Sequence, residues 1–145
     1  MAKKLALDDK AADIIHKALR LDEVLPGVKA AGIAALFPTS GLYEYAPDEH
    51  IIEQEDTGKD VYVLCAGKVA IAKTFGTAGA NLADLAPGGV FGEMALLRDG
   101  VRVATAAAQG KCSVFRLSAK DIAEVMESHP PLGAHLKELA DKRSR

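Results

Sequence analysis

One stretch of the sequence, residues 91–104, combines residue types that suit the binding of an anion. Gly92 and Glu93 precede a few good helix formers, and Arg102 lies near the start of a strand that we expect at 101–107. Free N–H groups at the start of a short helix attract an anion, glycine allows close approach to the backbone, and arginine offers phosphate oxygens a planar fork of donors. A carboxylate would repel a phosphate, so Glu93 is expected to face a pair of sugar hydroxyls. The stretch therefore predicts a ligand with one phosphate near a ribose.

Helices are expected at the start of the chain. Asp8 and Asp9 can cap a first helix. Its apolar residues follow helical spacing at Ala11, Ile14, Ile15, Ala18 and Leu19. A second, shorter helix is predicted at 28–36, before a cluster of turn-forming residues. We therefore place an N-terminal helical segment at 1–36.

The middle of the chain changes to short runs of strand-forming residues separated by glycine or proline. The predicted strands lie at 42–45, 50–53, 61–64, 69–72, 82–85, 101–107 and 112–117. Many short strands with turn residues every eight to twelve positions or so are typical of a sandwich or barrel. The predicted fold class is therefore α+β, and mainly β.

The chain returns to helices near its C-terminus. Ser118 is expected to cap a helix, and Asp121 resembles the acidic member of a capping box. Pro130-Pro131 should end that helix, and a final helix is predicted to start at about Leu132. The inward row of this final helix is expected to contain Leu132, Leu136 and Leu139.

The composition is that of a single soluble domain. The chain has 145 residues, with 18 basic and 20 acidic side chains and a net charge of −2. This balance predicts neither nucleic-acid binding nor attraction to an anionic membrane. No apolar run is long enough to span a bilayer, and the N-terminus lacks the apolar core of a secretory signal. We therefore expect a cytoplasmic protein.

The other reactive side chains form no pattern typical of catalysis or of a metal site. The histidines are scattered along the chain at His16, His50, His129 and His135. The hydroxyls considered as nucleophiles, those of Ser40, Thr57 and Thr77, have no sequence context that indicates activation. Cys65 and Cys112 lie in apolar runs and are expected to be buried free thiols. We therefore expect neither an enzyme, nor a metal, nor a cofactor.

The stretch at 91–104 resembles the phosphate-binding cassette of the cyclic-nucleotide-binding domain family, a group of catabolite-activator-like regulatory barrels. That cassette reads Phe-Gly-Glu, any residue, Ala-Leu, a short loop, usually Pro-Arg, a small residue and Ala. The matching residues are Phe91, Gly92, Glu93, Ala95, Leu96, Arg102 and Ala104. The resemblance implies an eight-stranded antiparallel β-barrel or jelly roll with a short cassette helix and C-terminal lid helices, at 37–145.

The resemblance also implies a role for individual residues. Glu93 would accept a hydrogen bond from the ribose 2′-hydroxyl, and Arg102 would neutralise the cyclic phosphate. The backbone N–H groups that would bind phosphate oxygens are those of Gly92, Met94, Ala95 and Val103. The base would lie against apolar barrel residues, with Ile71 and Met94 as candidates. The final helix would close over the base as a lid.

Ligand preference and output follow from the same resemblance. Family members that prefer cGMP tend to carry Thr or Ser just after the cassette arginine, where this chain has Val103. The resemblance thus implies cAMP as the favoured ligand over cGMP. Movement of the lid would report the ligand to a protein partner or to a fused effector domain.

Some residues depart from the family pattern. Val101 stands where proline is usual, and Asp48 and Glu55 stand near turn positions where glycine is frequent. These departures concern loop geometry and remove no ligand contact.

Two other interpretations stay open at this point. The chain could be an interaction or dimerisation module whose barrel no longer binds nucleotide, although Glu93 and Arg102 argue against this. It could also be a cupin-type barrel enzyme, against which the missing metal ligands argue. A DNA-reading helix-turn-helix would have no room between the final helix and Arg145, so we expect no direct contact with nucleic acid.

Overall fold

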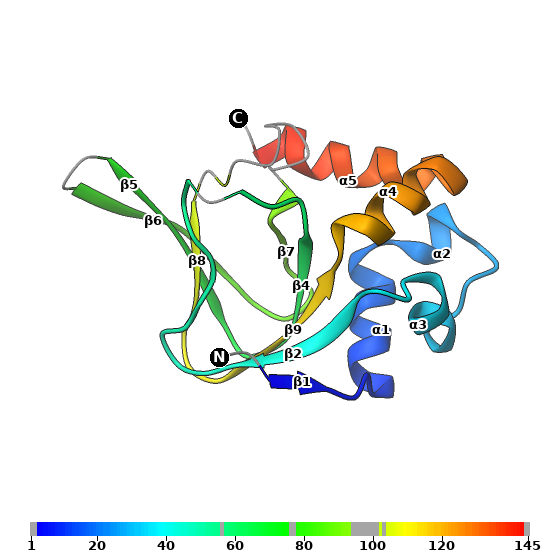
Figure 1. Ribbon diagram of the computed structural model, residues 1–145, viewed down its shortest axis with the longest axis horizontal. Helices are drawn as coiled ribbons and strands as arrows, with labels where there is room; N and C mark the ends of the chain where they lie inside the picture. The colour runs from blue at the N-terminus through cyan, green and yellow to red at the C-terminus, as the bar shows by residue number, and fades with distance from the viewer. Residues whose placement is uncertain (1–2, 56, 76–77, 94–101, 103, 144–145) are drawn as a thin grey trace.

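The computed structural model of the protein describes residues 3–55, 57–75, 78–93, 102 and 104–143. Its strands form two antiparallel sheets (Figure 1). The first sheet has the order β1 (Lys3–Leu5), β2 (Gly41–Tyr45), β9 (Cys112–Leu117), β4 (Val61–Ala66) and β7 (Val90–Phe91). The second has the order β3 (His50–Ile52), β8 (Thr105–Ala108), β5 (Val69–Phe75) and β6 (Ala78–Leu85).

The α+β class and the antiparallel strands are confirmed, but the predicted eight-stranded barrel is not matched. The described residues form nine strands in two separate sheets, and no ladder among them joins one sheet to the other. Two strands lie outside the ranges predicted from the sequence, namely the two-residue β7 and the strand β1, and β1 pairs with β2 at the edge of the first sheet. Three residues are too few to show a period of two, so only the pairing with β2 reveals this strand. The predicted cassette helix lies outside the described residues.

The first sheet separates two hydrophobic clusters, and β4 contributes to both. Val61, Val63 and Cys65 belong to the cluster on the helical side. Tyr62 and Leu64 belong to the cluster between the two sheets. Side chains alternate between the two faces of a strand, so a strand that is covered on both sides must be apolar throughout. This explains why 61–65 reads as a continuous apolar run and why all five residues are buried.

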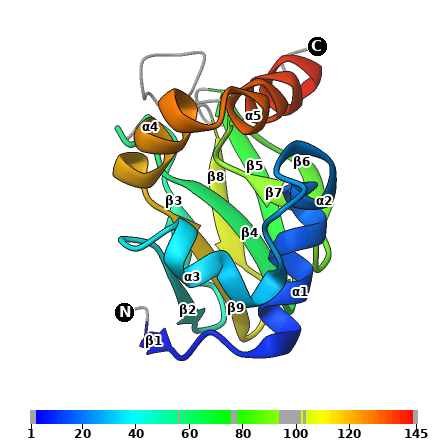
Figure 2. The ribbon, with the colours of Figure 1, turned by 90° about the vertical axis from the view of Figure 1, so that its right-hand side faces the viewer.

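The N-terminal helices pack against the first sheet on the side away from the second sheet (Figures 1 and 2). They are α1 (Asp9–Ala18), α2 (Leu21–Val24), the 3-10 turn η1 (Ala30–Gly32) and α3 (Ile33–Leu36). The Asp8 carboxylate caps α1 by accepting a hydrogen bond of 2.8 Å from the Ala11 N–H. The helix predicted at 28–36 is shorter than expected, because only its last part is α-helical and η1 precedes it.

The C-terminal helices α4 (Ala119–Ser128) and α5 (Pro130–Arg143) lie at one end of the sheets (Figure 1). Ser118 caps α4, as predicted, by accepting from the Asp121 N–H. The reciprocal half of a capping box is absent among the described residues, because the Ser118 N–H donates to Ser40 Oγ. The helix α5 begins at Pro130 rather than at Leu132, since proline suits the first turn of a helix.

The inward row of α5 packs against the N-terminal helices. Leu132 and Leu136 are buried in the same hydrophobic cluster as Ile15, Leu19 and Leu21. The Leu139 side chain lies outside the described part of the structure. The helix α5 also crosses α4 closely, because a Cβ at Gly133 would lie 2.9 Å from Met126 Cγ. The two ends of the chain therefore share one core.

Candidate functional site

The Arg102 guanidinium is buried and is held by backbone carbonyls. Arg102 is 7% exposed. Its Nη1 donates to the Gly92 carbonyl at 2.9 Å, and its Nη2 donates to the Asp60 carbonyl at 3.0 Å. Its Cζ atom also lies 5.9 Å from the centroid of the Tyr62 ring, within the range of a cation–π interaction. Two backbone carbonyls and an aromatic face thus contact this cation.

Strand pairing brings these groups together from distant parts of the sequence. The strands β4 and β7 pair so that Tyr62 faces Phe91, and the two rings stack with centroids 5.3 Å apart. Asp60 directly precedes β4, and Gly92 directly follows β7. Because the two strands are antiparallel, the start of one and the end of the other lie side by side. Their carbonyls can therefore both accept from one guanidinium.

Two glycines allow the backbone to approach Arg102. A Cβ at Gly92 would lie 3.0 Å from Arg102 Nη1, and the Gly92 φ of +87° is left-handed. A Cβ at Gly58 would lie 3.2 Å from Nη2. The absence of a side chain at Gly92 thus leaves room for the guanidinium, while the predicted approach of its backbone to an anion stays a prediction. A larger side chain at either position would crowd the cation.

The backbone of Arg102 is also fixed. The Glu55 N–H donates to the Arg102 carbonyl at 2.7 Å. Arg102 precedes β8 by three positions, whereas the sequence placed it near the start of a strand at 101–107. The turn that carries Glu55 therefore orients a residue almost fifty positions later in the chain.

Glu93 is buried next to Gly92. Only 1% of its surface is exposed. Burial lowers the pKa of Arg102, while Tyr62, Asp60 and the Glu93 carboxylate act to raise it. The charge of Glu93 thus favours the charged form of Arg102. An arginine remains charged in such surroundings.

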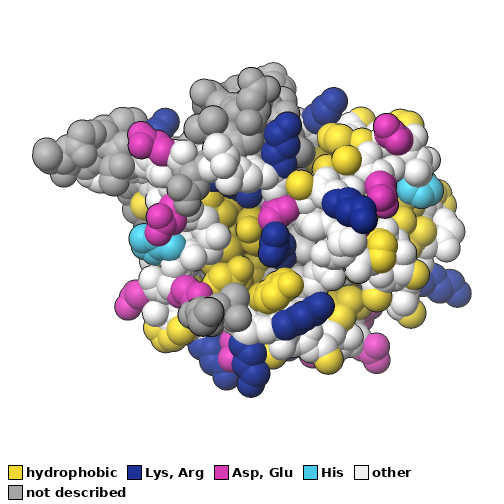
Figure 3. Space-filling model, viewed as in Figure 1, with side chains coloured by type: hydrophobic (Ala, Val, Ile, Leu, Met, Phe, Trp, Pro, Cys, Tyr) yellow, Lys and Arg dark blue, Asp and Glu magenta, His cyan; other side chains and the backbone are white. Residues whose placement is uncertain are grey.

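Ile71 lies on the inner face of the second sheet. It pairs with Ala83 and Ala106, and it packs against the cluster between the sheets while remaining partly exposed. Figure 3 shows hydrophobic side chains in the middle of this face of the molecule, next to basic and acidic side chains. Ile71 therefore offers a partly exposed apolar side chain against which a flat ring could lie.

The other predicted ligand-binding residues, Met94, Ala95 and Val103, lie outside the described residues. The structure therefore describes Gly92, Glu93, Arg102 and Ile71 of the predicted set, and it brings Gly92 into direct contact with Arg102.

Sequence reasoning missed three residues of the site, which are Gly58, Asp60 and Tyr62. Gly58 lies between the strands predicted at 50–53 and 61–64, and nothing local indicates that it lies against Arg102. Tyr62 reads as an ordinary strand residue, and Asp60 contacts Arg102 through its backbone, which carries no sequence signal.

The structure shows neither a reactive thiol nor a metal site among the described residues. Cys65 and Cys112 are buried free thiols, as predicted, and burial raises the pKa of each to about 11. The described residues contain no group of His, Cys, Asp and Glu side chains that could hold a metal ion. Among the helices described, none has the length and apolar character needed to cross a membrane.

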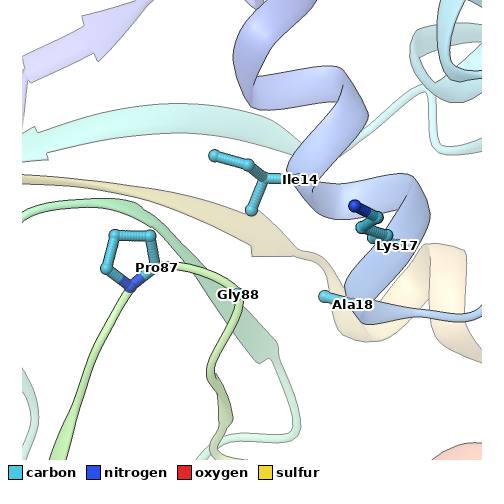
Figure 4. A pocket seen from close by; sticks show the side chains of 5 residues that line it. All are labelled: Ile14, Lys17, Ala18, Pro87 and Gly88. Carbon is cyan, nitrogen blue, oxygen red and sulfur yellow. The ribbon is translucent and has the colours of Figure 1, made fainter.

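An open groove lies elsewhere, between α1 and the turn before β7 (Figure 4). Its lining residues are Ile14, Lys17, Ala18, Pro87 and Gly88. It shares no residue with the Arg102 site and offers one charged side chain.

The family model described as "Cyclic nucleotide-binding domain" matches residues 42–129, which is more than half of the sequence. The chain therefore belongs to the cyclic nucleotide-binding domain family.

Individual relatives show how widely this domain is used. The chain is 33% identical over 102 residues to the Cyclic AMP receptor protein of Thermus thermophilus, covering 70% of this chain and 47% of that protein. It is 34% identical over 86 residues to human potassium/sodium hyperpolarization-activated cyclic nucleotide-gated channel 4, covering 59% of this chain and 7% of the channel. The chain thus spans less than half the length of these relatives.

A solved structure has a similar fold. The crystal structure of the Thermus thermophilus Catabolite Activator Protein superimposes with a TM-score of 0.72 and 28% identity, covering 84% of this chain and 58% of that one. Antiparallel sheets with flanking helices are therefore common to both proteins.

Proposed function

We propose that this chain is a sensor domain that binds a cyclic nucleotide between Arg102 and Glu93. The observation that carries the proposal is the environment of Arg102, which is 7% exposed and donates to the carbonyls of Gly92 and Asp60. A buried cation is costly unless an opposite charge or strong hydrogen bonds compensate it. A phosphate would supply both.

The geometry favours a small anion over a protein side chain. The glycines at 58 and 92 bring backbone rather than side chains against the guanidinium. Hydrogen bonds between arginine and phosphate are shorter and stronger than those to neutral carbonyls. A cyclic phosphate would therefore compete well for the guanidinium donors.

Glu93 would accept a hydrogen bond from the ribose 2′-hydroxyl. Its position beside Gly92, which contacts Arg102, supports this role, because a ribose lies next to the phosphate in a cyclic nucleotide. The base would lie against Ile71 on the inner face of the second sheet. The residues Met94, Ala95 and Val103 would complete the cassette.

We further propose that cAMP is preferred over cGMP. Val103 has no hydroxyl with which to reach a guanine donor, and the Cyclic AMP receptor protein is among the relatives of this chain. The output would be a movement of the C-terminal helices that a partner or a fused effector reads. We propose no catalytic role for the domain.

The decisive experiment is calorimetric titration of the chain with cAMP, comparing wild type with Arg102→Ala. Loss of the phosphate's main counter-charge should weaken binding at least about tenfold, since each hydrogen bond to a charged group contributes roughly 1.5–3 kcal/mol. Lys111→Ala is the control, because Lys111 is exposed and pairs with Glu44 outside the site. Wild-type affinity in Arg102→Ala would refute the proposal, and a wild type that binds no nucleotide would favour an interaction module.

A second prediction isolates the role of Glu93. Glu93→Ala should weaken binding of cAMP by about tenfold, because a charged acceptor for the ribose hydroxyl is lost. The same substitution should hardly change binding of 2′-deoxy-cAMP, which lacks that hydroxyl. Calorimetric titration of wild type and Glu93→Ala with each ligand gives four affinities. Their comparison isolates the interaction between Glu93 and the 2′-hydroxyl. An equal loss for the two ligands would show that Glu93 does not contact the 2′-hydroxyl.

A further inference from the structure

His135 lies at the junction where α5 meets the end of α1. It is 7% exposed, and Leu132 and Leu136 on the same helix are buried in the cluster that contains the residues of α1 and α2. The Ala18 carbonyl, at the last position of α1, accepts a hydrogen bond from the His135 ring. The ring nitrogen Nε2 is buried and has no hydrogen-bond partner among the described residues. The neutral ring therefore donates through Nδ1, and the lone pair of Nε2 faces the protein interior.

A proton on Nε2 finds no acceptor in this arrangement. It turns a buried lone pair into a buried N–H and adds a positive charge, and a buried charge is costly unless it is paired and hydrogen-bonded. The carboxylate on the N-terminal side, that of Glu23, already accepts from Arg20 Nε at 2.8 Å. The docked position of α5 therefore favours the neutral imidazole.

The charges around the ring come from both sides of the junction, and together they do not offset the cost of burial. Burial lowers the pKa of His135 most, and Arg20 lowers it further. The Ala18 carbonyl, Glu138 on α5 and Glu23 on α2 act to raise it, but the net shift is downward. From α4, which also packs on α5, no described charged group acts on this histidine. Protonation of His135 and docking of α5 thus oppose each other.

The helix α5 can leave this position without breaking either sheet. It lies at one end of the sheets, and in the described ladders no strand pairs with it (Figure 1). A single residue joins it to α4. Elements outside the strand ladders open at a lower free energy than the sheets that form the centre of a domain. A charge on His135 therefore acts first on the docking of α5.

We propose that His135 is an acid-operated latch: protonation at Nε2 releases α5 from the N-terminal helices while both sheets stay folded. No residue of the proposed nucleotide site takes part in the latch, and its operation needs no ligand. In a sensor whose output is a movement of the C-terminal helices, the proton would be a second input beside the nucleotide.

The test is native-state hydrogen exchange of the ligand-free chain at about pH 7.5 and pH 5.5. Opening constants of the amides of residues 136–139 in α5 are compared with those of Val63 and Leu64 in β4, after correction for the intrinsic exchange rate at each pH. The α5 amides should open more readily than the β4 amides at both pH values, which marks a local opening. Their opening constant should rise severalfold on acidification, and at most about tenfold, because a released histidine has a pKa of about 6.5.

His135→Gln is the decisive variant, because glutamine takes up no proton in this range. The rise of the α5 opening constant in acid should be lost in this variant. His129→Gln is the matched control, since it removes a histidine directly before α5 that is not part of the junction, and the rise should persist in it. A full rise in His135→Gln would overturn the latch. Equal opening constants for α5 and β4 at both pH values would overturn it as well, because α5 would then open only with the whole domain.

A variant outside α5 keeps the outcome interpretable if His135→Gln is unfolded. Arg20→Ala leaves His135 in place and removes a positive charge that disfavours the imidazolium. The rise in acid should then become smaller, and an unchanged or larger rise would overturn the latch. Binding of cAMP is measured separately on the wild type, so a chain that binds no nucleotide would refute the proposed function and leave the exchange result for His135 as it stands.

Discussion

Glu55 shows how much a single backbone conformation contributes to the site. Its φ of 75° is left-handed, a region that favours glycine, and its N–H donates to the Arg102 carbonyl. Asp48 has a similar φ of 67°. The sequence placed both residues near positions where the family often has glycine, and the structure confirms that unusual turns occur there. The chain keeps these turns although its side chains do not favour them.

At the residue scale, Glu55→Gly should therefore stabilise the protein. Glycine removes the steric penalty of a left-handed Glu, which should raise the free energy of unfolding by about 1 kcal/mol. Urea unfolding at neutral pH measures the change. Glu53→Gly is the control, because residue 53 has no left-handed φ and should lose stability. Equal destabilisation by both substitutions would show that the Glu55 turn carries no strain.

At the element scale, α4 depends on contacts that its own sequence does not supply. Its first turn is held by Ser118, by Asp60 and by the hydroxyls that Asp121 accepts from. A helix of ten residues is marginal in isolation, so these tethers and its packing maintain it. The connection between α3 and β2 and the start of α4 thus behave as one unit.

Asp121→Asn should weaken this unit in a pH-dependent way. Burial raises the pKa of Asp121, but hydrogen bonds from Ser40, Thr39 and Ser118 outweigh it, so the pKa is lower than usual. A carboxyl whose pKa is lowered by folding stabilises the protein above its unfolded pKa of about 3.9, and this contribution is lost as the pH falls through the folded value. The substitution should cost about 2 kcal/mol at neutral pH and less in acid.

Urea unfolding at pH 7 and at low pH checks this expectation. Asp13→Asn on the exposed face of α1 is the control and should change stability little at either pH. A loss of stability in Asp121→Asn that is the same at both pH values would contradict the role of the ionised carboxylate.

At the scale of the whole molecule, the two ends of the chain meet at α5. His135 is 7% exposed on this helix, and its Nε2 is buried without a hydrogen-bond partner among the described residues. Burial lowers the pKa of His135, Arg20 lowers it further, and the Ala18 carbonyl, Glu138 and Glu23 oppose this. A neutral imidazole therefore fits the junction of α5 with the N-terminal helices better than a charged one.

Acid should loosen this junction. A histidine whose pKa is lowered by folding binds its proton more tightly in the unfolded chain, so stability is full above the unfolded pKa of about 6.5 and declines as the pH falls through it. The Tm of the wild type should thus fall between about pH 7.5 and pH 5.5. His135→Gln should flatten this decline when Tm is followed by circular dichroism. His129→Gln is the control, and a flattened profile in the control instead would assign the effect to another histidine.

Short-range features of this protein could be predicted from its sequence. The caps Asp8 and Ser118 act within three residues, and both are confirmed. The runs of strand-forming residues at 61–64 and 112–117 predicted β4 and β9. The first run is apolar throughout because both faces of β4 are covered. The cassette motif singled out Gly92 and Arg102, which the structure places in contact, because these residues lie within a dozen positions and leave a local pattern.

Long-range partners were decided only by the tertiary structure. Asp60 and Tyr62 reach Arg102 because β4 pairs with β7, and no local pattern encodes that pairing. The strand β1 exists because β2 offers it a free edge, and the leucines of α5 are buried because the N-terminal helices lie beside them. Helical or strand periodicity and helix capping depend on residues that are neighbours in the chain. Which strands pair and which helices pack together depends on how the apolar faces of all the elements are buried at once.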